Sequence, residues 1–205
     1  MTEQDAQELH EYKVLIDRYI DAGDGQRIEI AAEIERRFSV ETTILVLDIS
    51  GFTRLTSKFG IVHYLSMIRR MQLLTTSIIT DHQGEIIKFE ADNLFAHFPD
   101  VDAAIGFSLD VLQRFRSMNV STNDHSDIYA SIGIASGSVL VLEHRDAWGS
   151  TMNLASKLGE DLAEKDEVLV HEDAFSASRK KSFYATERLE LMASGISIPA
   201  RKIRG

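Results

Sequence analysis

The spacing of apolar residues changes along the chain between the period of a helix and that of a strand, and this change marks out the expected elements. Apolar side chains recur every three or four positions over residues 61–82 and again over 104–118, which predicts two amphipathic helices. Between them, segments 85–90 and 93–98 are separated by only two residues, a spacing typical of a β-hairpin. The middle of the chain is therefore expected to run helix, hairpin, helix.

The second half of the chain shows the period of strands. Apolar residues occupy every second position of 128–135, and Gly137 is expected to turn this strand back into 139–142. The remaining expected elements are a helix over 151–163 and strands over 167–170, 185–191 and 196–203. Because strands and helices are interspersed and the hairpins are short, the pattern predicts an α+β domain in which helices pack on an antiparallel or mixed sheet.

One strand differs from the others because its apolar run is continuous. Residues 44–47 (ILVL) have no polar position, which is typical of a central strand covered on both faces. The run ends on Asp48 and the turn Ser50-Gly51, where backbone N–H groups can point outward. A carboxylate beside exposed N–H groups suits a polyphosphate bound with magnesium. The alternative is that Asp48 only caps the turn.

The N-terminal part has a helical pattern that carries no candidate chemistry. Residues 4–38 predict one or two helices with a break at 22–25. We expect residues 1–40 to form a helical segment that serves as a packing arm, a dimer contact or a coupling element. Residues 41–205 are then expected to form one domain.

Composition narrows the classes of function. The formal net charge is -10, which makes a nucleic acid an improbable partner. The chain has no cysteine, which excludes disulfides and thiolate chemistry, and its seven histidines lack the spacing of a metal site. No apolar segment approaches the length of a membrane span and the N-terminus does not resemble a signal peptide, so a cytoplasmic protein is expected.

The predicted hairpin carries a lysine and a second carboxylate. Asp92 stands where the second strand begins, so it lies beside the end of the Asp48 strand if the two strands pair. Two carboxylates at adjacent strand ends can hold a pair of divalent cations, as in phosphoryl transfer. Strand alternation places Lys88 on the face opposite Ile87 and Phe89. The alternatives are a solvated strand lysine and an ordinary turn aspartate.

A second candidate group lies in the stretch DAWGSTMNLASKL. Asn153 and Lys157 are four residues apart, so they project from one helical face and can hold a ribose oxygen and a phosphate oxygen together. Asp146 can accept a hydrogen bond from an exocyclic amine. The alternatives are a polar helix face in water and a loop acid. The packed side of this helix is expected to carry Met152, Ala155 and Gly159.

Taken together, these stretches resemble the catalytic domain of class III nucleotidyl (adenylyl or guanylyl) cyclases. The resemblance covers about residues 41–177. It rests on four motifs in the order and spacing of that family: DISGFT (48–53), GEIIKFEADNLFAHF (84–98), GIASGSV (133–139) and DAWGSTMNLASKL (146–158). The fold that it implies is a ferredoxin-like βαββαβ sheet with helices packed on it.

The resemblance assigns roles to individual residues. Asp48, Asp92 and the backbone of Ile49 match the metal-binding positions of the family, which uses two Mg²⁺ or Mn²⁺ ions at each active site. Lys88 and Asp146 match the pair that selects the base, and their identities accompany adenine in that family. The backbone that holds the phosphates corresponds to Ile49, Ser50, Gly51, Phe52 and Thr53.

The resemblance also implies the reaction and the assembly. Asn153 matches the asparagine that stabilises the transition state, and Lys157 stands where the family has a catalytic arginine. The expected protein is an adenylate cyclase that converts ATP to 3′,5′-cyclic AMP and pyrophosphate. Its expected form is a homodimer, with each active site shared by the two chains and an upstream sensor or regulator as a further partner. The alternatives are a guanylate cyclase, which Asp146 disfavours, and a catalytically silent cyclase-like module that binds nucleotide or dimerises.

Three departures from the family pattern bear on activity. Lys157 keeps the charge of arginine and loses its forked geometry, which is expected to lower turnover. Ala91 replaces the glycine that precedes the second aspartate, at a cost of roughly 1 kcal/mol if the turn needs a positive φ. Ser138 and Met192 stand where the family often has basic residues against the triphosphate.

Overall fold

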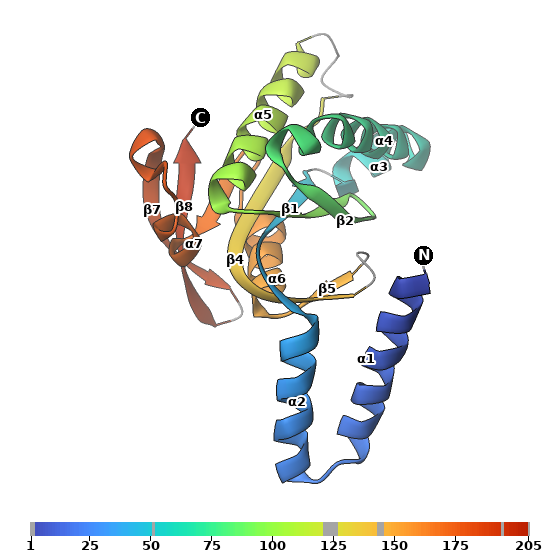
Figure 1. Cartoon of the computed structure of the whole chain (residues 1–205). Coiled ribbons are helices and arrows are strands. Elements are labelled where there is room, and N and C mark those ends of the chain that lie inside the picture. The colour runs from blue at the N-terminus through green and yellow to red at the C-terminus, as the bar shows by residue number, and fades with distance from the viewer. Residues whose placement is uncertain (1–2, 51, 121–126, 143–145, 194, 205) are drawn as a thin grey trace.

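The chain folds into a sheet covered by helices, with a helical hairpin extending from it. The computed structural model describes residues 3–50, 52–120, 127–142, 146–193 and 195–204. The hairpin consists of α1 (Glu3–Asp21) and α2 (Asp24–Phe38), and Figure 1 shows it extending away from the sheet. The helices expected in residues 4–38 are present, and the role of residues 1–40 stays a prediction.

Within the described ranges, the strands form one eight-stranded mixed sheet in the order β2-β3-β1-β4-β6-β8-β7, with β5 paired to β4. The pair β4–β6 is parallel and the other pairs are antiparallel. The four strands β2-β3-β1-β4 have the ferredoxin-like order, which confirms the expected α+β fold. The strands are β1 (Ser39–Ile49), β2 (Glu85–Glu90), β3 (Asn93–Phe98), β4 (Ala130–Leu142), β5 (Asp146–Trp148), β6 (Val168–His171), β7 (Ala185–Ala193) and β8 (Ile196–Arg204).

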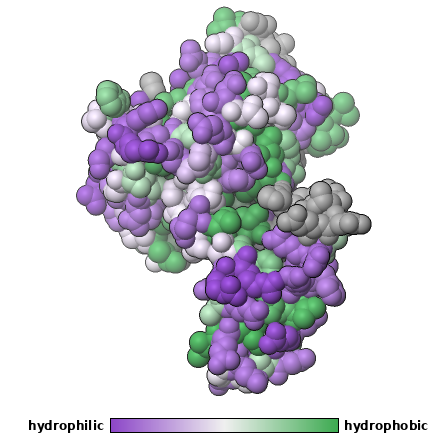
Figure 2. All heavy atoms as spheres, viewed as in Figure 1, coloured by the Kyte–Doolittle hydropathy of each residue, from purple (hydrophilic) through white to green (hydrophobic). Residues whose placement is uncertain are grey.

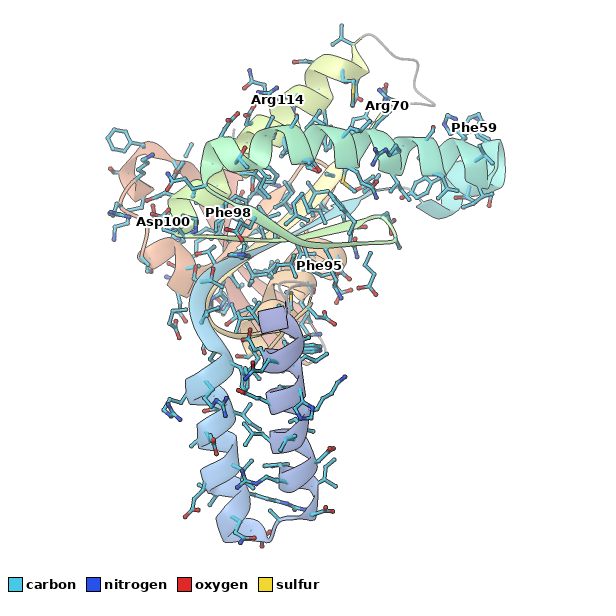
Figure 3. The ribbon with its side chains drawn as sticks, turned by 45° about the vertical axis from the view of Figure 1, so that its right-hand side comes forward. Phe59, Arg70, Phe95, Phe98, Asp100 and Arg114 are labelled. Carbon is cyan, nitrogen blue, oxygen red and sulfur yellow. The ribbon has the colours of Figure 1, made fainter. Side chains whose placement is uncertain are left out.

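Strand β1 is covered on both faces, as its continuous apolar run predicts. Leu45 and Leu47 pack on one side with α4 and α5, whereas Ile44 and Val46 pack on the other side with α6. The same division is visible along β3, where Phe98 and Phe95 lie on opposite sides of the sheet (Figure 3). The helices of the first face are α3 (Phe52–Phe59), α4 (Ile61–Ile78) with a 3₁₀ turn (Ile79–His82), and α5 (Val101–Asn119).

The second face carries a helix that changes its hydrogen-bonding pattern. Helix α6 (Ser150–Ser156) continues directly into a π-helical segment (Lys157–Leu162), so the helix expected over 151–163 is present but not uniform. Short π segments within helices frequently lie at functional sites. The C-terminal part adds the short helix α7 (Glu172–Ser176) and a 3₁₀ turn (Lys181–Phe183).

The prediction of a turn at Gly137 is wrong. Strand β4 continues through this residue because β1 pairs with it over its whole length, from Ser39↔Leu140 to Ile49↔Ala130. The glycine is required for another reason: a Cβ atom on it would lie 2.8 Å from the hydroxyl oxygen of Thr151 in α6. The hydrogen-bonded pairing with β1, which is distant in sequence, thus overrides the local preference of glycine for a turn.

The helical hairpin contacts the sheet through a small apolar cluster. Leu15 of α1 and the α2 side chains Ile30, Ile34 and Phe38 are buried together, and Leu140 of β4 packs against them. Ile28, farther from the sheet, is 74% exposed. Figure 2 shows apolar patches on this hairpin among a mostly hydrophilic surface. None of the described helices is long and apolar enough to cross a membrane.

Candidate active site

The two candidate metal-binding aspartates lie at the same end of the sheet. Strands β1 and β3 are antiparallel neighbours, and Asp48 is paired directly with Asn93. Asp92 precedes Asn93 in the two-residue turn between β2 and β3, so it lies one residue from the partner of Asp48. The pairing on which the sequence argument depended is therefore present.

Among the described residues, the charges that act on the Asp48 carboxylate are other carboxylates. Burial, and then the neighbouring carboxylates of Asp92 and Glu160, raise the pKa of Asp48 to about 7. The pKa of Glu160 is also raised, first by burial and also by the charges of Asp92 and Glu90. Like charges that raise one another's pKa are stabilised when a cation binds among them. This donor set therefore fits a divalent cation.

Carboxylates alone do not complete a metal site here. Among the residues that the structure describes, no group of three or more histidine, aspartate and glutamate side chains can hold a metal ion. Magnesium is commonly bound by one or two carboxylates together with water and substrate phosphates. A cation between Asp48 and Asp92 would therefore take further oxygen ligands from the backbone, from other side chains or from a nucleotide.

Tyr64 of α4 contacts two of the candidate metal-binding groups, although in the sequence it is only one position of the apolar stripe over 61–82. Its side chain is completely buried, and its hydroxyl donates to the Asp92 carboxylate at 2.8 Å. The same hydroxyl lies 3.3 Å from the carbonyl oxygen of Ile49. Because a buried tyrosine hydroxyl usually needs a partner, its place in an otherwise apolar stripe is a signal that the sequence contains.

The expected phosphate-holding turn is only partly available for binding. The backbone N–H of Ser50 donates to the carbonyl of Tyr129 at 2.9 Å, so it does not point outward as predicted. Gly51 lies outside the described residues, as do the side chains of Phe52 and Thr53. The backbone of these two residues begins α3, and the first N–H groups of a helix have no partner within it.

The candidate base-selecting residues are brought together across the sheet. The Nζ atom of Lys88 lies 3.0 Å from an oxygen of Asp146 and 2.7 Å from an oxygen of Glu90. These hydrogen bonds, first to Glu90 and then to Asp146, raise the pKa of Lys88. The ammonium group also lies 5.3 Å from the centre of the Phe95 ring. Lys88 is therefore a positioned cation and not a freely solvated one.

The predicted orientation of Lys88 needs one correction. An irregularity in β2 lies between the pairs Ile86↔Ala96 and Lys88↔Phe95, so the strand has one extra residue at Ile87. Ile87 is buried with Phe95 on the α6 side of the sheet, the side on which Lys88 contacts the Phe95 ring. The bulge places Ile87 and Lys88 on one side, whereas Phe89 packs on the opposite side as predicted.

Asn153 and Lys157 lie at the exposed side of the α6 segment. Asn153 is exposed, and Lys157 begins the π-helical segment and is partly buried. The packed side is as predicted: Met152, Ala155 and Gly159 all face the sheet.

Two glycines explain how closely this segment approaches the sheet. A Cβ atom on Gly133 of β4 would lie 2.2 Å from the carbonyl oxygen of Ala155 and from the backbone nitrogen of Gly159. A Cβ atom on Gly159 would in turn lie 2.7 Å from the carbonyl oxygen of Val46 in β1. Only glycine at both positions lets the backbones pack in direct contact.

The turn before Asp92 is strained, as the departure from the family pattern predicts. Ala91 has a φ angle of 52°, in the left-handed region that a Cβ atom disfavours. The cost is about 1 kcal/mol. The turn nevertheless closes the β2–β3 hairpin and leaves Asp92 bonded to Tyr64.

These features define a class of protein: a ferredoxin-like sheet with two aspartates at adjacent strand ends is the arrangement of nucleotidyl cyclase domains. The family described as the Adenylate and Guanylate cyclase catalytic domain matches residues 34–202. The chain belongs to this family, the class III nucleotide cyclases.

Individual relatives are distant in sequence and close in fold. An adenylate cyclase from Streptomyces griseus is 26% identical over 163 residues, which make up 80% of this chain and 39% of that protein. The chain thus spans well under half of that relative. The non-canonical dimeric guanylyl cyclase domain of the RhoGC fusion protein from the aquatic fungus Blastocladiella emersonii has a TM-score of 0.69 at 21% identity, covering 82% of this chain and 98% of that chain. The guanylate cyclase domain of RhGC from Catenaria anguillulae, in complex with GTP, has a TM-score of 0.65 at 20% identity, covering 81% of this chain and 97% of that chain.

Proposed function

We propose that this protein is an adenylate cyclase that converts ATP to 3′,5′-cyclic AMP and pyrophosphate. The observation that carries the choice of base is the pair formed by Lys88 and Asp146, 3.0 Å apart. Adenine presents an exocyclic amine, which donates to a carboxylate, beside a ring nitrogen, which accepts from an ammonium group. Guanine presents a carbonyl where adenine has its amine, and this oxygen would face the carboxylate of Asp146 unfavourably.

The groups that would hold the cations are Asp48, Asp92 and the carbonyl of Ile49. The raised pKa of Asp48 and the hydrogen bond from Tyr64 to Asp92 support this assignment. Mg²⁺ or Mn²⁺ ions held there, two of which are expected at each site, would supply the charge that lowers the pKa of the ribose 3′-hydroxyl and neutralises the phosphates. The protein's own contribution is to fix the two carboxylates at neighbouring strand ends before the nucleotide arrives.

The remaining groups act on the phosphates and the ribose. The first backbone N–H groups of α3, at Phe52 and Thr53, would bind phosphate oxygens. Asn153 would donate to the ribose region as charge develops in the transition state, and Lys157 would place a cation near the transferred phosphate. The resemblance assigns the metal-binding aspartates to one chain of a homodimer, and the base-selecting residues (Lys88, Asp146) and transition-state residues (Asn153, Lys157) to the other chain. One chain alone is therefore expected to be inactive.

The direct test is an assay of both nucleotides with matched variants. Purified protein incubated with ATP and Mn²⁺ is expected to form cyclic AMP, measured chromatographically, and to form much less cyclic GMP from GTP. Asp92→Ala should abolish product. Glu172→Gln is the matched control because Glu172 is a structural acid bonded to Arg201, away from these residues. Equal rates with ATP and GTP would contradict the assignment of the base.

A catalytically silent module is the second candidate, and two observations favour it. Ala91 has a strained φ angle, and Lys157 lacks the fork of arginine. A silent module would bind ATP, measured by calorimetry, and form a dimer, measured by light scattering, but it would give no cyclic product with Mn²⁺. Product that is formed by the wild type and lost in Asp92→Ala would reject this candidate.

A further inference from the structure

Asn93 carries a buried polar atom that the fold does not satisfy. Its side-chain oxygen is inaccessible to water and has no hydrogen-bond partner in the described part of the chain. A buried amide oxygen without a partner costs about 1–3 kcal/mol, and such an atom in a native protein points to strain, a catalytic role, or a water or ion that it binds. In the sequence, Asn93 is an ordinary residue at the start of the strand expected over 93–98.

The strand pairing places Asn93 beside the candidate metal site. Asn93 is paired directly with Asp48 on one side and with Glu90 on the other. Side chains of directly paired residues lie on the same face of a sheet, with Cβ atoms about 4.5–5.5 Å apart. The side chains of Glu90 (β2), Asn93 (β3) and Asp48 (β1) therefore lie in one row at this end of the sheet, with Asn93 between the two carboxylates.

Among the described residues near this row, Glu160 is a further acceptor, and Lys88 and Tyr64 are donors that already have partners. Glu160 adds a further carboxylate that acts on Asp48. The Lys88 ammonium is bonded to Glu90 and Asp146. On the other side of the sheet, the Tyr64 hydroxyl is directed to Asp92 and Ile49. An amide oxygen among carboxylates suits a cation, because divalent cations such as Mg²⁺ and Ca²⁺ are bound by carboxylate and carbonyl oxygens together.

We propose that the side-chain oxygen of Asn93 is a ligand of the divalent cation held by Asp48. This inference deepens the proposed function, because it rests on a cation binding beside Asp48. The Asn93 side chain supplies a neutral oxygen ligand at a place where the described carboxylates alone do not complete a metal site. Asn93 is thereby a metal ligand as well as a strand residue.

One other arrangement of the same amide makes a different prediction. If the amide is rotated by 180°, its nitrogen occupies the buried position and donates to the carboxylate of Asp48, so that Asn93 orients a ligand instead of being one. Aspartate at position 93 distinguishes the two roles. It keeps an oxygen that can bind a cation and removes the N–H group that could donate.

The experiment measures the binding of Mn²⁺ without nucleotide, by calorimetry and by the electron paramagnetic resonance signal of free Mn²⁺. Asn93→Ala is expected to weaken binding about 10-fold or more, the scale seen when a group around a metal is lost. Asn93→Asp is expected to bind Mn²⁺ at least as tightly as the wild type and to melt at a lower temperature in EDTA, because a carboxylate adds repulsion beside Asp48. Ser136→Ala is the matched control; it is a polar residue of the same sheet, bonded to Thr43 far from this edge, and should bind Mn²⁺ as the wild type does.

The outcomes separate this inference from the proposed function. If Asp48→Asn weakens Mn²⁺ binding and Asn93→Ala does not, the inference is wrong and the metal site of the proposed function survives. If both Asn93 variants bind Mn²⁺ weakly, the amide acts as a donor to Asp48 and the inference is also wrong. If Asn93→Ala does not fold, Asn93→Asp decides by its affinity. A wild type that binds no Mn²⁺, with or without a non-reactive ATP analogue, overturns both.

Discussion

Replacing Tyr64 by phenylalanine removes one hydroxyl from the candidate metal site and leaves the ring that fills the core. The hydroxyl donates to the Asp92 carboxylate at 2.8 Å. A hydrogen bond to a charged group contributes about 1.5–3 kcal/mol to stability. Because Asp92 is only partly buried, water replaces some of this interaction, and we expect a loss near the lower end, about 1.5 kcal/mol. For a chain of this size, that loss corresponds to a fall in Tm of about 3–6 °C.

The same substitution should change the dependence of activity on metal. Without the hydroxyl, the Asp92 carboxylate can rotate, so more Mn²⁺ should be needed for half-maximal cyclic AMP formation, while the rate at saturating Mn²⁺ changes less. Stability is measured by urea unfolding in EDTA, and activity by titration with Mn²⁺. The two measurements distinguish a general loss of packing from a loss of ligand orientation.

Tyr184→Phe is the matched control for this prediction. Tyr184 also bonds an aspartate, Asp102, at 3.4 Å, but Asp102 keeps donors from Ser178 and the Arg179 backbone. The control should change the Mn²⁺ dependence of activity no more than the experimental error. A Tyr64→Phe protein with the stability and the Mn²⁺ dependence of the wild type would refute the role given to this hydroxyl.

Three further predictions follow from the geometry of the site. Ala91→Gly should raise the free energy of unfolding by about 1 kcal/mol, because it relieves a left-handed φ angle; a urea series without a gain would contradict this. The pKa of Asp48 is raised from 3.8 to about 7, so the folded protein binds more protons than the unfolded chain in this window. Metal-free stability should therefore fall as pH rises across it, and Asp48→Asn should weaken that dependence in thermal melts. Lys157→Arg should raise kcat for cyclic AMP formation by restoring the forked donor, and an unchanged or lower kcat would contradict the assignment.

The elements that the sequence predicts correctly are those whose signal is local. The helices over 61–82 and 104–118 and the hairpin between them follow from apolar periodicity, which reflects the covered side of each element. The continuous run 44–47 likewise predicts a strand covered on both faces, and its residues divide between the two cores.

The errors occur where a distant strand decides the local structure. Gly137 has a turn signal, but the long β1 ladder keeps β4 extended through it. Strict alternation predicts opposite faces for Ile87 and Lys88, but a bulge in the β2–β3 pairing places them on one side. The N–H group of Ser50 bonds Tyr129 from the segment before β4. None of these pairings is visible from the neighbouring residues in the sequence.

The site residues that the sequence predicted are those that lie in the family motifs. Lys88 and Asp146 are far apart in the chain, and only the resemblance brought them together before the structure did. Tyr64 and Asn93 were missed because each has an ordinary explanation in sequence, as a residue of an apolar stripe and as the start of a strand. Their importance depends on which atoms lie opposite them, and that is a property of the folded sheet.

The two faces of the sheet contribute to the site in different ways. This difference explains the excess of negative charge at the end of the sheet where Asp48 and Asp92 lie. From the α4 side, Tyr64 supplies a neutral donor to Asp92. From the α6 side, the contact between Gly133 and Gly159 brings the π-helical segment, with Glu160, close enough for that carboxylate to act on Asp48. Among the described residues, the charges that act on Asp48 are those of Asp92 and Glu160, while Lys88 is paired with Glu90 and Asp146. The carboxylates at this end of the sheet repel one another in the protein alone. We expect a bound metal ion to stabilise them, so that the strength of metal binding would depend on the packing of both helical layers.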